Sequence, residues 1–90
     1  MTFEWDLVKA KANMLRHGVD FADAATSFND VHALTVIDPD SESEERHLTV
    51  AQDVNGRVLV TCFAFRGNSI RIISSRKASP GERRRYGVIR

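Results

Sequence analysis

The stretch Ile70–Tyr86, IRIISSRKASPGERRRY, decides how this chain is expected to fold. Side chains alternate between the two sides of a strand with a period of two residues. Ile70 and Ile72 therefore share one side, and Arg71 points to the other. An apolar side that faces a core and a charged side that faces outward predict a strand over residues 69–75.

A helix signature follows this strand. Ser79 supplies an N-cap, Pro80 takes the first helical position, and Glu82 stands three residues after the cap, from where it can bond back. We therefore predict a short C-terminal helix. The stretch also holds six basic residues, which are Arg71, Arg76, Lys77, Arg83, Arg84 and Arg85.

Charge is divided unevenly along the 90 residues, which we interpret as one domain, residues 1–90. Residues 1–45 hold ten acidic and three basic side chains, and residues 46–90 hold ten basic and two acidic ones. Such polarity indicates a nucleic-acid surface on the basic side. The alternative is that the two halves neutralise each other in the fold.

The sequence argues against a protein that depends on cysteine chemistry and against a secreted or membrane protein. The single cysteine, Cys62, stands in an apolar run and is expected in the core, without a disulfide or a catalytic role. The sequence contains no signal peptide and no apolar run of roughly 18 residues, so we expect a cytoplasmic protein without membrane contact.

The N-terminal third predicts two helices. The first begins after Asp6 and ends at Gly18, and the second begins after Asp20 and ends near Asn29. Each has residues at helical spacing that we interpret as an apolar stripe. These are Val8, Ala12 and Leu15 in the first helix, and Phe21, Ala24, Ala25 and Phe28 in the second.

The rest of the chain reads mainly as strands. They are expected at residues 2–5, 31–37, 46–52, 57–65 and 69–75, with a mobile acidic loop at 38–45. Asn55-Gly56 predicts a two-residue type I′ hairpin turn. The predicted fold class is α+β: an antiparallel sheet of four to five strands, two N-terminal helices on one face, and a short C-terminal helix.

The chemistry that the sequence permits is narrow. His17, His32 and His47 show no metal-site spacing, and no Gly-rich phosphate loop or nucleophile elbow occurs. Acid–base and electrostatic groups remain. They suit RNA cleavage, in which the substrate supplies its own 2′-OH as the nucleophile.

Arginines are the first candidates for phosphate contacts. Guanidinium groups bind phosphate oxygens in pairs and stay charged, which favours Arg71 and Arg76. The alternative for both is solvated surface charge. Arg83, Arg84 and Arg85 follow one another on a helix, where a turn of about 100° per residue prevents all three from facing one ligand.

Three further residues have more than one interpretation. Glu45 is a general base or a solvated loop residue, and His17 is a base or a helix C-terminal cap. Tyr86 stacks on a base, serves as an acid or anchors the core. Lys9 is most simply a solvent-facing lysine.

The chain resembles the BrnT family of toxins from type II toxin–antitoxin pairs. The resemblance covers nearly the whole chain in order. It is carried by FEWD with Lys9, RHGVDF within residues 13–21, Phe28-Asn29-Asp30, Glu45-Arg46, RIISSRKAS and ERRRY.

This resemblance implies a RelE-like fold and a metal-independent endoribonuclease, without a cofactor, that halts translation. It also implies a BrnA-like antitoxin, a ribbon-helix-helix protein whose complex with the toxin contacts operator DNA. The positions that match the family pattern are Lys9, His17, Glu45, Arg46, Arg71, Arg76, Lys77, Glu82, Arg83 and Tyr86.

We therefore expect a catalytic group and an RNA-binding group of residues. The catalytic residues are Arg71, Arg76, Glu45 and His17. The RNA-binding residues are Arg46, Lys77, Arg83, Arg84, Tyr86 and Lys9. The alternative is a non-catalytic nucleic-acid-binding or co-repressor module derived from such a toxin.

Overall fold

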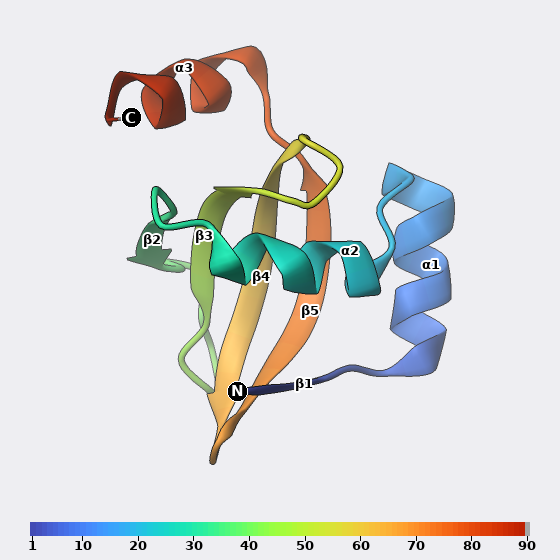
Figure 1. Cartoon of the computed structure of the whole chain (residues 1–90). Helices are drawn as coiled ribbons and strands as arrows, with labels where there is room; N and C mark the ends of the chain where they lie inside the picture. The colour runs from blue at the N-terminus through green and yellow to red at the C-terminus, as the bar shows by residue number, and fades with distance from the viewer. Residues whose placement is uncertain (90) are drawn as a thin grey trace.

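The computed structural model describes residues 1–89 and has an α+β fold built on a mixed five-stranded sheet (Figure 1). The elements in chain order are β1 (Thr2–Glu4), α1 (Leu7–His17), α2 (Phe21–Thr26), the 3-10 helix η1 (Ser27–Asn29), β2 (Leu34–Ile37), β3 (His47–Gln52), β4 (Val58–Arg66), β5 (Ser69–Lys77) and α3 (Pro80–Ile89).

The strand order is β1-β5-β4-β3-β2, which puts the apolar strand β4 in the centre as predicted. Strands β2 to β5 form an antiparallel meander, but β1 runs parallel to β5. The prediction of an antiparallel sheet is therefore wrong for this pair. A parallel neighbour needs a long crossover connection, and the whole chain between β1 and β5 provides it.

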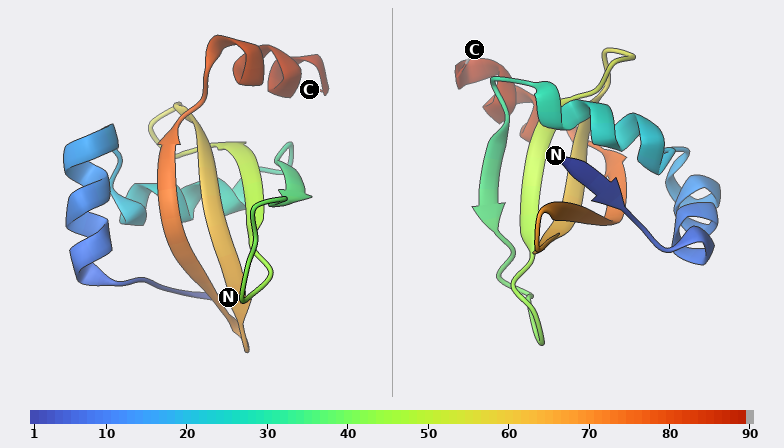
Figure 2. Two further views of the ribbon diagram at one scale, coloured as in Figure 1. Left: turned by 180° about the vertical axis from the view of Figure 1, so that it is seen from behind. Right: turned by 60° about the horizontal axis from the view of Figure 1, so that its bottom comes forward.

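The core lies between α2 and one face of the sheet. As predicted, Phe21 and Ala24 are buried and Ala25 and Phe28 pack against them, while Phe28 meets Phe63 of β4 edge to face with ring centroids 4.9 Å apart. The buried cluster consists of Val19, Phe21, Ala24, Leu59, Phe63, Ile70 and Ile72. The other face of the sheet is crossed by no helix of residues 1–89 (Figure 2). We call it the open face.

Helix α1 begins and ends as predicted but does not bury the predicted side. Asp6 accepts hydrogen bonds from the first-turn N–H groups, and Gly18 ends the helix with a φ of 68°. The helix lies beside β5 rather than over the sheet face (Figure 1). Val8 and Leu15 are 77% and 89% exposed. The predicted apolar stripe is therefore wrong, because the side turned inward carries Asn13.

The Asn13 side chain takes the place of a neighbouring strand. Its amide NH₂ donates to the carbonyl oxygens of Ser75 and Val19, at 2.8 and 3.0 Å, and its amide oxygen accepts from the N–H of Ser75 at 3.1 Å. Strand β1 pairs with β5 only as far as Arg71. Asn13 thus satisfies buried backbone groups on β5 beyond the end of β1.

The β3–β4 hairpin has a different turn from the predicted one. The N–H of Gly56 donates to the carbonyl of Asp53 at 3.0 Å, and the N–H of Asp53 donates to the carbonyl of Arg57 at 2.8 Å. Gly56 has a φ of 81°, whereas Asn55 is not in the positive-φ region. A type I′ turn needs positive φ at both residues, so this is a three-residue loop with one left-handed position.

Replacing Gly56 with valine should lower the free energy of unfolding by roughly 1 kcal/mol or more, because a β-branched residue resists positive φ. Space is not the reason, since an added Cβ would meet only the Gln52 side chain, at 3.7 Å. Asn55→Val is the matched control and should lower the free energy of unfolding by a smaller amount. Chemical denaturation measures both variants, and equal losses would contradict the turn described here.

Helix α3 begins with the predicted reciprocal cap. The Glu82 N–H donates to Oγ of Ser79 at 3.2 Å, and the Ser79 N–H donates to Oε1 of Glu82 at 2.8 Å. The helix lies across the end of the sheet where β4 begins and β5 ends (Figure 1). It therefore stands beside the open face.

Candidate functional site

A β-bulge brings Arg71 and Arg76 to the same side of the sheet. They stand five positions apart, so strict alternation would place them on opposite sides. The pairing of β5 with β4 shifts between Cys62 and Phe63. As a result Arg71 faces Ala64 and Arg76 faces Val60. Because these two β4 partners share the open face, so do the two arginines.

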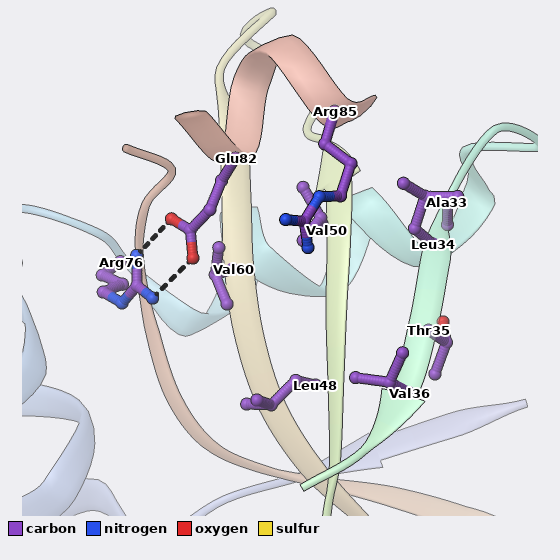
Figure 3. A pocket seen from close by; sticks show the side chains of 10 residues that line it. All are labelled: Ala33, Leu34, Thr35, Val36, Leu48, Val50, Val60, Arg76, Glu82 and Arg85. Carbon is purple, nitrogen blue, oxygen red and sulfur yellow. Dashed lines mark hydrogen bonds and ion pairs between the residues drawn. The ribbon is translucent and has the colours of Figure 1, made fainter. Parts of the chain in front are cut away.

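The open face contains a pocket of about 510 Å³ (Figure 3). Its floor is apolar, and its rim near α3 carries charged groups. The lining residues are Ala33, Leu34, Thr35, Val36, Leu48, Val50, Val60, Arg76, Glu82 and Arg85. An apolar floor beside guanidinium groups can accept a flat base or sugar together with a phosphate.

Arg76 is held by Glu82 of α3. Its Nη1 and Nη2 donate to the two carboxylate oxygens at 2.8 and 3.0 Å (Figure 3). The hydrogen bond from Arg76, followed by the one from the Ser79 N–H, lowers the pKa of Glu82 from 4.5 to about 2. The Glu82 carboxylate therefore caps the N-terminus of α3 and also connects this helix to β5 through Arg76. The same contact fixes the orientation of the Arg76 side chain.

This pairing should make the docking of α3 sensitive to acid. The pKa of Glu82 is depressed on folding, so its contribution to stability is present above pH 4.5 and is lost as the pH falls towards about 2. We expect wild type to be more stable than Glu82→Gln at pH 7, and the difference to shrink over this range. Thermal unfolding of both proteins at several pH values measures it, and a pH-independent difference would contradict the assignment.

Tyr86 anchors α3 rather than presenting its ring. It is 2% exposed, and its hydroxyl donates to Oδ2 of Asp30. Burial raises the pKa of Asp30, but the N–H of Gln52, the hydroxyl of Tyr86 and the N–H of His32 outweigh it and hold the pKa below its ordinary value. The expected stacking of Tyr86 on RNA is therefore corrected, since a ring buried in this way offers no face to a base.

Arg46 and Glu45 lie where the acidic loop enters β3. Glu45 is exposed, with Oε1 3.7 Å from Nε2 of His47. Burial and the charge of Asp38 raise the pKa of the Cys62 thiol, while the charge of Arg46 opposes them. Arg46 is the residue just before β3. Its Nε is buried without a hydrogen-bond partner among the described residues.

His17 and Lys9 lie in a second groove, of about 200 Å³, between α1 and β5. Its lining residues are Lys9, Ala12, Asn13, Arg16, His17, Ile73 and Ser74. The groove shares no residue with the pocket on the open face. It reaches β5 at Ser74, which is two residues before Arg76. The structure therefore divides the predicted catalytic residues between neighbouring sites.

The arginines of α3 separate as their helical spacing requires. Arg85 lines the open-face pocket, whereas the predicted RNA-binding residues Arg83 and Arg84 are exposed and do not. Lys77 is likewise exposed, at the end of β5. Arg85 was missed as a candidate. Its spacing of three residues from Glu82 could have identified it, since such residues share one side of a helix.

The described residues contain neither a metal-binding cluster nor a membrane-spanning helix. No group of three or more His, Cys, Asp or Glu side chains within residues 1–89 is placed to hold a metal ion. In the same part of the chain, no helix has the length and apolarity needed to cross a membrane.

Comparison with known proteins identifies the family of this chain. A search of curated proteins gives no match. A crystal structure of the Brucella abortus ribonuclease toxin BrnT matches with a TM-score of 0.66 and 24% identity, over 88% of this chain and 97% of that one. The family model described as "Ribonuclease toxin, BrnT, of type II toxin-antitoxin system" matches residues 5–82. The chain therefore belongs to the BrnT family of ribonuclease toxins.

Proposed function

We propose that this chain is a toxin that cleaves RNA at the open face of its sheet and thereby stops translation. One observation carries the proposal: the bulge in β5 puts Arg71 and Arg76 on a face that no helix of residues 1–89 covers. Arg85 adds a third guanidinium at the pocket rim. Arg71 forms no ion pair with any described residue, so its charge is available to a phosphate.

The reaction is an attack by a ribose 2′-oxygen on the adjacent phosphorus. The new 2′-O–P bond forms, the P–O5′ bond breaks, and the products are a 2′,3′-cyclic phosphate and a 5′-hydroxyl. A base takes the 2′-OH proton and an acid returns a proton to O5′. Arg71 and Arg76 stabilise the charge that develops on the phosphoryl oxygens.

Two side chains are proposed as alternative bases. His17 lies in the groove that meets β5 beside Arg76, and Glu45 is exposed at the start of β3. Lys77, at the end of β5, and Arg83, on α3, are both exposed and are proposed to supply further phosphate contacts. The pH–rate profiles of His17→Gln and Glu45→Gln distinguish the two candidates. Replacing the residue that acts as the base removes the rise in cleavage rate that follows its deprotonation.

The proposal includes metal-independent cleavage in the cytoplasm, without a cofactor. Cationic side chains supply the electrostatic stabilisation that a metal ion provides in other nucleases. It also includes a BrnA-like ribbon-helix-helix antitoxin as the partner that neutralises the toxin. Operator DNA is contacted only through the complex of the two proteins.

A non-catalytic co-repressor is the second candidate, and one observation favours it. Both carboxylate oxygens of Glu82 accept hydrogen bonds from the guanidinium group of Arg76. A phosphate must share Arg76 with Glu82 or bind through its remaining N–H groups. If Arg76 stays occupied, the face binds nucleic acid weakly and does not cleave it.

Primer-extension mapping of cellular RNA after brief expression tests the proposal. Defined cut sites with 2′,3′-cyclic phosphate ends, unchanged by a chelator in a purified reaction, are expected. Cleavage should also weaken as salt rises, because phosphate contacts release counterions. Ends with a 3′-hydroxyl, or intact RNA during growth arrest, would contradict the mechanism.

A further inference from the structure

Helix α1 presents a ridge of apolar side chains to solvent. Leu15, Val8, Leu7 and Met14 are 89%, 77%, 74% and 51% exposed. At 3.6 residues per turn, positions 7 and 14 fall on one side of the helix, and positions 8 and 15 fall beside them. The four residues, here called the α1 ridge, lie on adjoining sides of the helix, with the exposed Ala12 between positions 8 and 15 and the exposed Lys11 between positions 7 and 14. A cluster of exposed apolar side chains of this kind marks an interaction site.

A groove of about 440 Å³ adjoins the ridge. Trp5, Ala10 and Met14 are among the residues that line it, together with Leu7 and Val8 of the ridge. The ring of Trp5 packs edge to face on the core residue Phe21, with centroids 6.0 Å apart. One wall is thus held by the core, and the groove can receive an apolar side chain from a partner.

The charges around the ridge are mainly basic, although Asp20 also lines the groove, where its carboxylate accepts the N–H of Ala22 at 2.9 Å. Helix α1 carries Lys9, Lys11 and Arg16 and no acidic residue. Asp6, just before it, already accepts the N–H groups of Val8 and Lys9, at 2.8 and 3.1 Å. A complementary partner therefore offers apolar side chains flanked by carboxylates, as an acidic amphipathic helix does.

Two other occupants fit less well. A second copy of this chain, paired symmetrically through the ridge, would bring two basic helices together. RNA would find leucine, valine and methionine where it needs cations or flat rings. The toxin of a type II pair has a protein partner, and the ridge matches a protein of opposite charge.

We propose that the α1 ridge and its groove are the docking site of the antitoxin, which binds there through an acidic amphipathic helix. This inference rests on the proposed function, since it takes the chain as the toxin of a pair. Helix α1 lies beside β5, whereas α3 and β2, which contribute residues to the open-face pocket, lie away from it (Figures 1 and 2). Binding to the antitoxin and cleavage of RNA therefore use different residues.

The test is a Val8→Glu, Leu15→Glu double variant of the full chain, titrated with the purified cognate antitoxin by calorimetry. We expect the affinity to fall at least roughly 100-fold, because two carboxylates would meet an acidic, apolar partner. RNA cleavage by the isolated variant should stay at the wild-type rate. Val31→Glu with Val54→Glu is the matched control, at two other exposed valines, and should bind normally.

The outcomes separate this inference from the proposed function. Wild-type affinity in the double variant overturns the docking site, whether or not RNA is cleaved. Loss of antitoxin binding in a chain that cleaves no RNA supports the docking site and removes the catalytic proposal. A wild-type chain that is dimeric by light scattering, and that the double variant makes monomeric, would assign the ridge to a second copy instead. Circular dichroism confirms that each variant is folded.

Discussion

Replacing Arg71 and Arg76 together with alanine should lower the rate of RNA cleavage at least roughly 100- to 1,000-fold, the usual cost of removing one preorganised charge-stabilising donor. Both side chains project from β5 onto the open face, and together they flank the position that we propose for the scissile phosphate. The losses from the single variants should not add up, because the two groups act on one developing charge. Single-turnover cleavage of a short RNA measures each rate.

Arg66→Ala is the matched control for this prediction. Arg66 also lies on the sheet and also pairs with a glutamate, Glu44, at 3.1 Å. Its loss removes an arginine and an ion pair but leaves the open-face pocket unchanged. Full activity in the Arg71→Ala, Arg76→Ala variant, or an equal loss in Arg66→Ala, would remove the assigned roles.

Replacing Asn13 with leucine should destabilise the chain by about 2–4 kcal/mol, because buried backbone groups of Ser75 and Val19 would lose their partners. The total free energy of unfolding of a domain of this size is only about 5–14 kcal/mol, so the melting temperature should fall sharply. Chemical denaturation measures the change. Asn29→Leu, at an exposed asparagine, is the control and should stay near wild type.

Elements with a strong local signal were predicted correctly from the sequence. The caps at Asp6, Asp20 and Ser79 and the stripe from Phe21 to Phe28 each depend on residues within one turn or helix. The sequence did not predict that β1 runs parallel to β5, because this contact joins distant parts of the chain.

The α1 ridge shows why helical spacing alone does not identify the buried side of a helix. Periodicity identifies an apolar side but does not say whether the protein's own core or a partner covers it. The inward side is set by Asn13, a polar residue whose amide meets the backbone of β5. No pattern within α1 indicates that contact.

The predicted site residues do not all lie together in the structure. Arg76 lines the open-face pocket, His17 and Lys9 line another groove, and Tyr86 is buried against Asp30. Each of these outcomes depends on how α1 and α3 approach β5. Residue type and order along the chain do not contain that information.

The bulge in β5 changes which residues of the strand face the core, from even-numbered positions before it to odd-numbered positions after it. Before it, even-numbered positions such as Ile70 and Ile72 supply the core; after it, the odd-numbered Ser75 does, and the even-numbered Arg76 turns to the open face. The same residues in a strand without the bulge would have to give up either the buried isoleucines or the pair of arginines, because Arg71 and Arg76 stand five positions apart. Deleting Ile73 should therefore remove the bulge and still leave both arginines on the open face, because Arg71 and Arg76 would then stand four positions apart in a regular strand.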